Sequence, residues 1–463
     1  MNDKINFQGI KVYAIILLML SGMPGHVSAQ QIITLDRAVE TALFNNYGIK
    51  ASESQVMEAR AKYAQAYSTF LPQADALSKY FYSNNLPGMY SLAGTSVPVL
   101  NNGSPTGDNI ILHSMAPYPD LARDAMTVDF NVTYPIYAGN KRKNALKGAS
   151  QLEAAYTSDL DETKAQTVLN VKTAFYNILF INELIKVNKE ALDQMSGHLS
   201  MAEKAYSEGT RSEFEVLSFK DKVEEFKSKI IEIEGNQKVA LLGLKNLMVI
   251  PDSINIECSG NLETDSLIFN SINAQNIKGV LDNSNKIRYL KSMKEVLDKK
   301  AKIEAAETLP LLFAFGNYHV YHGIDFPPFD VNWRQGYAAG IGLKINLFDG
   351  NMSKGRAAEI KAGIDKINNF QDGLTLKLDY EIQKSFTNIE SLKAQKISTG
   401  NNLKVTRKAY DIAKAAYMNG VITYLELNDA QLNITRAQTS ILNIEKSILI
   451  EYANLEYLNG DLK

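Results

Sequence analysis

Two stretches of the sequence decide the fold. Residues 126–140 read MTVDFNVTYPIYAGN, and residues 337–351 read YAAGIGLKINLFDGN. In each stretch apolar residues alternate with polar or small ones over eleven positions, and a glycine follows shortly afterwards. A period of two places neighbouring side chains on opposite faces of a β-strand. Both stretches are therefore predicted to be strands with one apolar face and one polar face.

These strands occupy equivalent positions of an internal repeat. Gly139 and Gly350 are 211 residues apart, and so are Gly209 and Gly420, which end matching Ala-Tyr-x-x-Gly segments. Self-similarity over such a long period indicates tandem structural units. We predict four segments: a signal peptide at 1–29, a first repeat at 30–250, a connector at 251–276 and a second repeat at 277–463.

The N-terminus has the pattern of a secretory signal. Lys4 and Lys11 precede the apolar residues 12–20, and the small residues 27–29 offer a cleavage site. Nine apolar residues are too few to span about 30 Å of hydrocarbon as a helix, so cleavage is favoured over a membrane anchor. No later run of 18 apolar residues occurs. Any membrane crossing is therefore assigned to strands.

Each half is predicted to contain a helix, two strands, a long helix, a tight turn and a last helix. The first helix is expected at 34–70, the strand pairs at about 74–136 and 311–348, and the long helices between the repeated glycines. Apolar residues recur there at alternating steps of three and four, which is the spacing of a coiled-coil seam. The clearest series are Val168, Val171, Phe175 and Ile178; Leu192, Met195, Leu199, Ala202 and Tyr206; Val216, Phe219, Val223, Phe226, Ile230 and Ile233; and Leu427, Ala430, Ile434, Ala437, Ile441, Ile444 and Ile448.

The composition and the positions of the titratable residues argue against nucleic-acid binding, catalysis and metal binding. A net charge of -2 offers no basic surface for nucleic acid. The single cysteine, Cys258, has no partner for an intrachain disulfide. His319 and His322 are three apart on a predicted strand and so point to opposite faces. We therefore predict no enzyme activity, no catalytic residue, no cofactor and no bound metal.

Four strands are too few to close a barrel in lipid, because single-chain outer-membrane barrels begin at about 8 strands and open edges are prohibited there. They are also too few for a β-sandwich of useful size. Three copies would supply twelve. The chain is therefore expected to oligomerise around its strands.

The mature chain, residues 30–463, resembles the TolC-like outer-membrane efflux proteins. The resemblance lies in the duplicated order of elements, in Leu71-Pro72 and Leu309-Pro310 before each first strand, and in the motif Tyr-x-x-Gly-x-x-[Ser/Thr]-x-[Phe/Leu]-Glu in each half. It implies a mainly α-helical homotrimer. A 12-stranded membrane barrel, with four strands from each chain, would continue into a long α-helical coiled-coil tunnel.

The resemblance also implies a location and partners. The channel would lie in the outer membrane of a Gram-negative bacterium, in contact with its lipid, and extend into the periplasm. It would dock to a periplasmic adaptor (membrane fusion) protein and an inner-membrane transporter of RND, ABC or MFS type. The expected function is a passive exit duct for drugs or other toxic small molecules. Type I protein secretion and metal-ion efflux remain alternatives, and a periplasmic coiled-coil adaptor is a less favoured one.

Three groups of residues are candidate sites by this resemblance. Glu426 and Asp429 match acidic rings at the periplasmic entrance, although acids in a first helical turn also complement the helix dipole. Tyr417 and Glu215 match a latch that holds the entrance shut, but Ile422 stands where the family has an arginine. The proposed adaptor contacts, which are at least helix-reversing turns, are Gly209, Thr210, Arg211 and Ser212, and Gly420, Val421, Ile422 and Thr423.

Two further features lie near the predicted strands. Residues 84–125 are rich in Asn, Pro, Gly and Ser and are predicted to be a long outward loop. A disordered cap is favoured over a receptor, phage-binding or lumen-capping role. Phe326, Phe329, Trp333 and Tyr337 suggest an aromatic girdle at a membrane interface.

Overall fold

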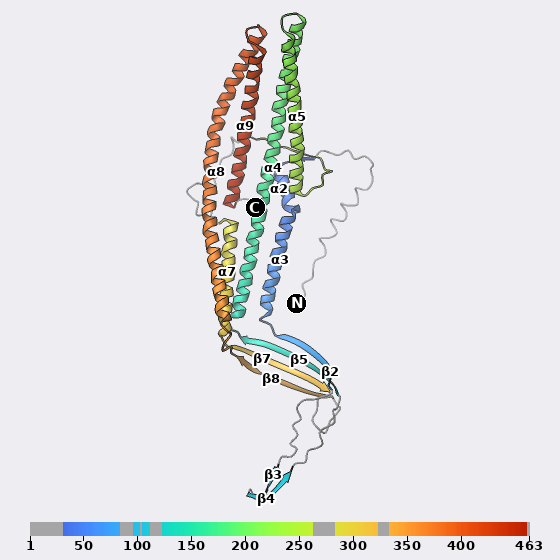
Figure 1. The fold of residues 1–463 in the computed structure, drawn as a ribbon, viewed down its shortest axis with the longest axis vertical. Coiled ribbons are helices and arrows are strands. Elements are labelled where there is room, and N and C mark those ends of the chain that lie inside the picture. Colours follow the sequence, from blue (N-terminus) through green and yellow to red (C-terminus); the bar gives the residue numbers. More distant parts are fainter. Residues whose placement is uncertain are drawn as a thin grey trace. The chain divides into compact units, whose positions relative to one another are not determined.

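The fold is mainly helical, with one four-stranded sheet (Figure 1). A computed structural model describes residues 31–83, 96–101, 104–111, 123–262, 283–322 and 333–460. The chain divides into two compact units. One takes Met1–Val56, Tyr156–Leu290 and Phe370–Lys463, and the other takes Met57–Ala155 and Lys291–Asn369. Each unit therefore uses residues from both halves of the repeat, and the predicted boundaries between repeats stay a prediction.

The first predicted helix is two helices. α2 spans Leu35–Asn45, with Thr34 as its N-cap as expected, and α3 spans Tyr47–Ser68. Asn46 interrupts them because its side-chain oxygen accepts the backbone N–H groups of Gly48 and Ile49 at 2.7 and 3.2 Å. Such capping offers the backbone an alternative to helix continuation. A continuous helix over 34–70 was therefore the wrong prediction.

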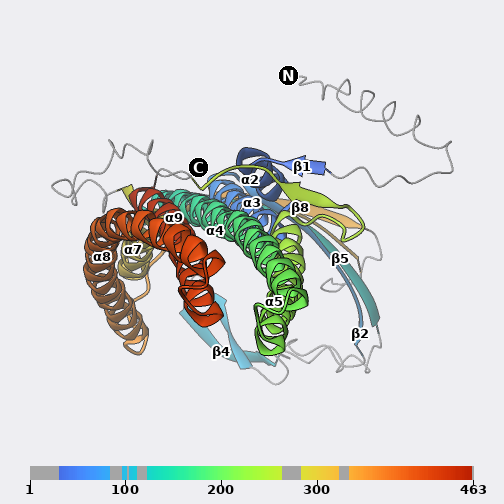
Figure 2. The same cartoon turned by 90° about the horizontal axis from the view of Figure 1, so that it is seen from above.

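Two long helical hairpins correspond to the predicted coiled coils (Figure 2). α4 spans Lys141–Ser207 and turns into α5, Glu213–Met248. α8 spans Met352–Met418 and turns into α9, Tyr424–Asn459. A shorter helix, α7, spans Asn285–Ala305 and continues into the 3-10 turn η3, Ala306–Thr308. At 1.5 Å per residue the 67-residue helices α4 and α8 are each about 100 Å long.

The predicted seams form the core of the helical unit. Most seam residues are buried, and the cluster near the hairpin turns joins all four long helices through Met195, Phe219, Tyr410 and Leu427. Tyr206 is the exception, because 47% of it is exposed. Heptad spacing thus located the packed face of the helices correctly. Within the described residues, no helix has both the length and the apolar character needed to cross a bilayer.

The sheet has the order β2-β5-β7-β8, and each neighbouring pair is antiparallel. Its strands span Gln73–Ser83, Arg123–Tyr137, Leu311–His322 and Arg334–Lys344. Directly paired residues share a face. Phe130, Tyr318 and Tyr337 therefore lie on the apolar face, which confirms the predicted alternation.

The opposite face carries a row of polar side chains. Asn131 donates to Asp75 at 2.9 Å, and Asn317 donates to Asn131 at 2.5 Å. His319 Nδ1 lies 3.0 Å from the Asn317 side-chain oxygen. These contacts run across β2, β5 and β7. The sheet therefore has one apolar face and one face with a row of polar side chains, and the second face also carries Phe313 and Phe315.

The last strand ends earlier than expected. The second strand pair was predicted to reach about residue 348, but the final pair of β8 joins Leu311 and Lys344. Pro310 precedes β7 and has no N–H to extend the ladder. The other side of β8 has no partner strand in the described chain. Residues 345–348 thus alternate as a strand would but lack a neighbour to pair with.

The segment predicted as a long loop contains a hairpin. β3, Ser96–Asn101, pairs antiparallel with β4, Ser104–Ile111. The prediction of a mostly disordered loop was therefore wrong for these residues. In the predicted connector, β6, Ile256–Cys258, pairs in parallel with β1, Gln31–Ile33, and so ties the start of the mature chain to the middle of the sequence. This pairing had no sequence signal that we recognised.

The predicted aromatic girdle is only partly visible. Phe326 and Phe329 lie outside the described residues. Trp333 stacks on His322 with ring centroids 5.3 Å apart, and 85% of Tyr337 is exposed on the apolar face. These two positions are compatible with the predicted interface.

Glycines of β8 lie beneath aromatic rings of β7. A Cβ added at Gly342 would lie 2.4 Å from Cζ of Phe313, and one at Gly340 would lie 3.0 Å from Cζ of Phe315. In contrast, a Cβ at Gly316 meets no atom within 4 Å. The two rings therefore lie close to the backbone of the last strand, and a side chain at Gly342 would require the Phe313 ring to move.

We expect Gly342→Ala to destabilise the sheet by about 1 kcal/mol, because the Phe313 ring must leave its rotamer. The matched change Gly316→Ala should have little effect. The measurement is the urea midpoint of refolding into lipid vesicles, followed by gel mobility. In a Phe313→Ala background the cost of Gly342→Ala should vanish. Equal midpoints for the two glycine variants would contradict this account.

Candidate functional site

The helix-reversing turns have the predicted chemistry. Gly209 follows α4 with a φ of +71°, and Gly420 follows α8 with a φ of +73°. Both values lie in the left-handed region that favours glycine. Ser212 accepts the backbone N–H of Glu215, and Thr423 accepts that of Glu426, each at 3.4 Å. These N-caps start α5 and α9 and complete two sharp reversals.

Glu426 forms a capping box. Its carboxylate accepts the backbone N–H of Thr423 at 2.8 Å and the Thr423 hydroxyl at 2.9 Å. These hydrogen bonds, the backbone one foremost, hold the pKa of the Glu426 carboxyl below its usual value. The carboxylate thus caps the N-terminus of α9 in its ionised form. Glu426 therefore has a structural role at the start of α9. Its place in an acidic ring stays a prediction.

Glu426 and Asp429 lie on one face, as predicted. Both line a groove of about 270 Å³ between α8 and α9, together with Thr406 and Asn433. Asp429 is exposed. The structure therefore brings the two acids together at the turn end of the second hairpin.

Arg211 connects the two hairpins. Its Nη2 donates to the backbone oxygen of Tyr417 at 2.7 Å, and its guanidinium lies 4.5 Å from the centre of the Tyr417 ring. Its Nη1 lies 3.5 Å from Oε1 of Glu215. Although Arg211 lies in a turn, only 19% of its side chain is exposed, and for Glu215 the figure is 15%. A planar guanidinium suits this combined stacking and hydrogen bonding.

The structure brings Tyr417 and Glu215 together but does not bond them directly. The Tyr417 hydroxyl and Oε2 of Glu215 are buried without a hydrogen-bond partner among the described residues. Burial, followed by the charge of Glu215, raises the pKa of Tyr417, and Arg211 opposes this. The guanidinium therefore joins the two residues that the sequence paired. Sequence reasoning placed Arg211 at the exposed tip and missed this role.

A repeat argument could have found Arg211. It lies two residues after Gly209, and Ile422 lies two residues after Gly420. The arginine that the family resemblance places in the second turn is thus present at the equivalent position of the first. The sequence signal for the role of Arg211 was therefore an arginine in the first turn at the position where the second turn has the apolar Ile422.

Aromatic rings pack beneath this contact. Phe219 meets Tyr417 edge-on at 5.8 Å and Tyr424 at 5.7 Å. Deeper in the bundle, His198 Nε2 lies 2.9 Å from the Tyr410 hydroxyl, and burial, with Lys414 as a second cause, lowers the pKa of His198 to about 4. The hairpin ends are therefore held by a neutral, mainly aromatic core with one arginine above it.

Metal-binding chemistry has no geometric support in the part of the chain that the structure describes. No group of three or more His, Cys, Asp or Glu side chains there is arranged to hold a metal ion. Burial raises the pKa of the Cys258 thiol to about 12, so it stays protonated. His319 and His322 face opposite sides of β7, as predicted.

The fold is that of outer-membrane channels. The chain is similar to the outer membrane protein VceC from Vibrio cholerae, with a TM-score of 0.75 and 17% identity over 92% of this chain and 96% of that one. The chain is also similar to the CmeC outer membrane channel of Campylobacter jejuni, with a TM-score of 0.73 and 16% identity over 92% of this chain and 85% of that one. A third similar structure is the MtrE outer membrane channel of Neisseria gonorrhoeae in its open state, with a TM-score of 0.73 and 13% identity over 92% of this chain and 88% of that one. None of the curated proteins matches the sequence.

The family follows from the sequence match. Residues 38–248 and 325–461 match the family model of the outer membrane efflux proteins. The chain therefore belongs to the outer membrane efflux protein family. It is an outer-membrane channel component of a tripartite efflux system and not an enzyme. The predicted family, the mainly helical fold and the location are thereby confirmed.

Proposed function

We propose that three copies of this chain form a passive exit duct that carries small toxic molecules out of the cell. The observation that carries this proposal is the sheet with two open edges. β2 and β8 end the sheet, and neither outer edge has a partner strand in the described chain. In hydrocarbon such edges must pair, so β8 of one copy would join β2 of the next. Three sheets joined in this way give the predicted twelve strands.

The helices support the same assembly. α5 exposes Ile231 and Val239, 70% and 68% accessible, and α8 exposes Leu376 and Ile397, 72% and 70% accessible. Regularly exposed large apolar residues on two long helices indicate contact faces. A neighbouring copy would cover them when the hairpins close into a tunnel. The turns at Gly209 and Gly420 would then form the periplasmic rim that contacts the adaptor.

The cargo is proposed from the efflux role of the family. Small molecules would reach the duct from an adaptor and an inner-membrane transporter of RND, ABC or MFS type. Metal-ion efflux and type I protein secretion are the competing cargoes. The duct itself supplies no energy, because the family's members are passive channels.

Removal of the gene, with the wild-type gene restored as control, tests the cargo. We expect the deletion strain to accumulate lipophilic dyes and to become several-fold more sensitive to small toxic compounds, with normal metal tolerance and an unchanged set of secreted proteins. Normal dye accumulation together with a missing secreted protein, or with lost metal tolerance, would contradict the proposed cargo.

The Arg211 contact is proposed as the latch of the entrance. It ties the end of α8 to the turn between α4 and α5, so the second hairpin cannot move away from the first without breaking it. The repeat places Tyr206 opposite Ile422 in the same relation as Tyr417 and Arg211. In a ring of three copies, charged latches within chains would alternate with apolar contacts between chains. This arrangement differs from the latch predicted from the sequence.

Arg211→Gln should open the entrance. Loss of a charged hydrogen bond is worth about 1.5–3 kcal/mol, so the open probability should rise about tenfold or more. Tyr417→Phe should behave as the wild type, because the lost hydroxyl has no hydrogen-bond partner among the described residues. Arg407→Gln, at an exposed arginine of α8, is the matched control. Single-channel recordings in planar bilayers provide the measurement.

A closed channel in Arg211→Gln would contradict the assignment of the latch. So would a Tyr417→Phe channel that opens as readily as Arg211→Gln, since the hydroxyl would then hold the gate.

Glu426 and Asp429 are proposed to form acidic rings around the axis of the assembly. Three copies would place six carboxylates there, and their field would favour cations. Glu426→Gln is a clean test because glutamine also completes a capping box. We expect Glu426→Gln combined with Asp429→Asn to lower the cation preference several-fold and to abolish block by multivalent cations. Bilayer reversal potentials that match those of a Glu390→Gln control would refute the rings.

A further inference from the structure

Buried polar atoms without hydrogen-bond partners gather near the turn ends of the two hairpins. Among the described residues, such atoms are Nδ1 of His198, Oε2 of Glu215, the hydroxyl of Tyr417, Oδ1 of Asn428 and Oε1 of Gln431. Each of these residues lies within about three helical turns of a hairpin end. All of them belong to one compact unit. The packing of this end of the unit therefore encloses polar atoms that it does not satisfy.

Gln431 occupies a position in the apolar seam of α9. It lies four residues after Leu427 and three before Ile434, and both belong to the buried cluster that joins the four long helices. Only 2% of Gln431 is exposed, and for Asn428 the figure is 3%. A polar residue at a buried position of a coiled-coil seam lowers the stability of the packed helices. The start of α9 thus contributes two amide side chains to a mainly apolar interior.

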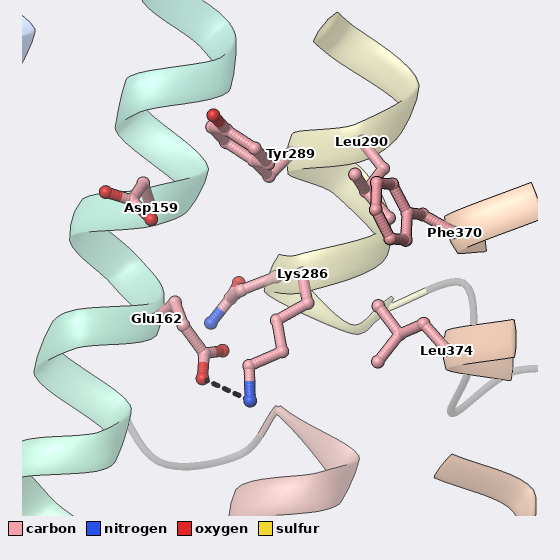
Figure 3. Close-up of a pocket in the computed structure, with 8 residues that line it drawn as sticks. Asp159, Glu162, Lys286, Tyr289, Leu290, Phe370 and Leu374 are labelled. Carbon is pink, nitrogen blue, oxygen red and sulfur yellow. Dashed lines mark ion pairs between the residues drawn. The ribbon is translucent and has the colours of Figure 1, made fainter. Parts of the chain in front are cut away.

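Polar groups farther from the turns in the same unit are paired. Lys286 Nζ lies 3.2 Å from the Glu162 carboxylate, beside a pocket of about 310 Å³ (Figure 3). On the second hairpin, Glu451 accepts a hydrogen bond from Ser385 Oγ at 2.9 Å and one from Asn388 Nδ2 at 2.8 Å. Pairing of such groups is therefore available in this unit, but the atoms near the turns do not have it.

The unpaired atoms favour separation of the hairpins. A polar atom that is taken out of water without a new hydrogen bond is unfavourable, and it regains its hydrogen bonds when the helices separate and water enters. These atoms are already enclosed within a single chain, so a neighbouring copy cannot reach them while the helices stay packed. Arg211 acts in the opposite sense, because it ties the end of α8 to the turn between α4 and α5.

We propose that these unpaired polar groups, above all Gln431, hold the closed entrance close in free energy to the open one. Closing buries the groups, and opening hydrates them. The contact of Arg211 then holds shut an entrance whose interior favours opening, so release of one small contact is enough to open it. This inference rests on the proposed gate at the hairpin ends. It gives Gln431 and Asn428 a part in the opening equilibrium, although neither belongs to the latch or to the acidic rings.

Gln431→Leu tests the proposal, because it replaces the unpaired amide by an apolar side chain of similar size. We expect the closed hairpin ends to become more stable. In the intact assembled channel, hydrogen–deuterium exchange of the backbone amides at the hairpin ends should slow about fivefold or more. In single-channel recordings of an Arg211→Gln channel, adding Gln431→Leu should lower the open probability by about the same factor.

Gln237→Leu is the matched control, because this glutamine of α5 is paired. Its Nε2 donates to Oδ1 of Asn182 on α4 at 2.7 Å. The same replacement there leaves Asn182 without that donor, so exchange of the surrounding amides should become faster or stay the same. Slower exchange in both variants would overturn the proposal, since any added apolar side chain would then have the same effect.

Unchanged or faster exchange in Gln431→Leu would also overturn the proposal, because Gln431 would then have a partner that stabilises the closed ends. If Gln431→Leu fails to assemble, Gln431→Met decides by the same outcomes, since its unbranched apolar side chain adapts to the space. An Arg211→Gln channel that stays closed would refute the latch. The exchange measurement on Gln431→Leu does not use that variant, so the two failures can be told apart.

Discussion

The unpaired backbone of two strand edges is the constraint on which the rest of the structure depends. The apolar face formed by residues such as Phe130 and Tyr337 is suited to lipid, and the row from Asp75 to Asn317 is suited to water. An unsatisfied N–H or C=O in hydrocarbon costs several kcal/mol, so β2 and β8 require neighbours. The part of one chain that the structure describes has no further strand paired at those edges. In the proposed assembly, association of copies satisfies these backbone groups, and side-chain contacts refine it.

The same constraint explains why we propose the gate at the helix turns and not in the sheet. Opening a closed sheet would break backbone hydrogen bonds between strands and so cost much free energy. Two helical hairpins can instead move against each other at their free ends. The charged part of the contact between the hairpins at this end is small, because it consists of Arg211 above a buried, mainly aromatic layer that includes Phe219 and Tyr417. Salt-sensitive contacts of this size can be exchanged for contacts with a partner. The long buried seams behind them hold each hairpin together during such a movement.

Periodic features were predictable from the sequence, and single contacts were not. The strands, the hairpin turns and the seams each repeat a simple spacing, and the duplication doubled the signal. The break at Asn46, the early end of β8 and the β1–β6 pair depend on one side chain or on a distant partner, which periodicity does not report. The sequence predicted that Glu426 and Asp429 share one face near the start of the last helix. The capping role of Glu426 became evident only in the structure. Arg211 was assigned to a surface because sequence cannot show that a turn residue folds back onto the opposite hairpin.

The mass of the intact assembly tests the central claim most directly. One chain of 51.4 kDa includes the predicted signal peptide, so the mature protein is slightly smaller. Native mass spectrometry of the channel, released from detergent without cross-linking, should give the mass of three mature chains, and no smaller folded species should retain the sheet. A folded single chain or a pair with intact β structure would contradict the account, because its strand edges would then be satisfied without two further copies.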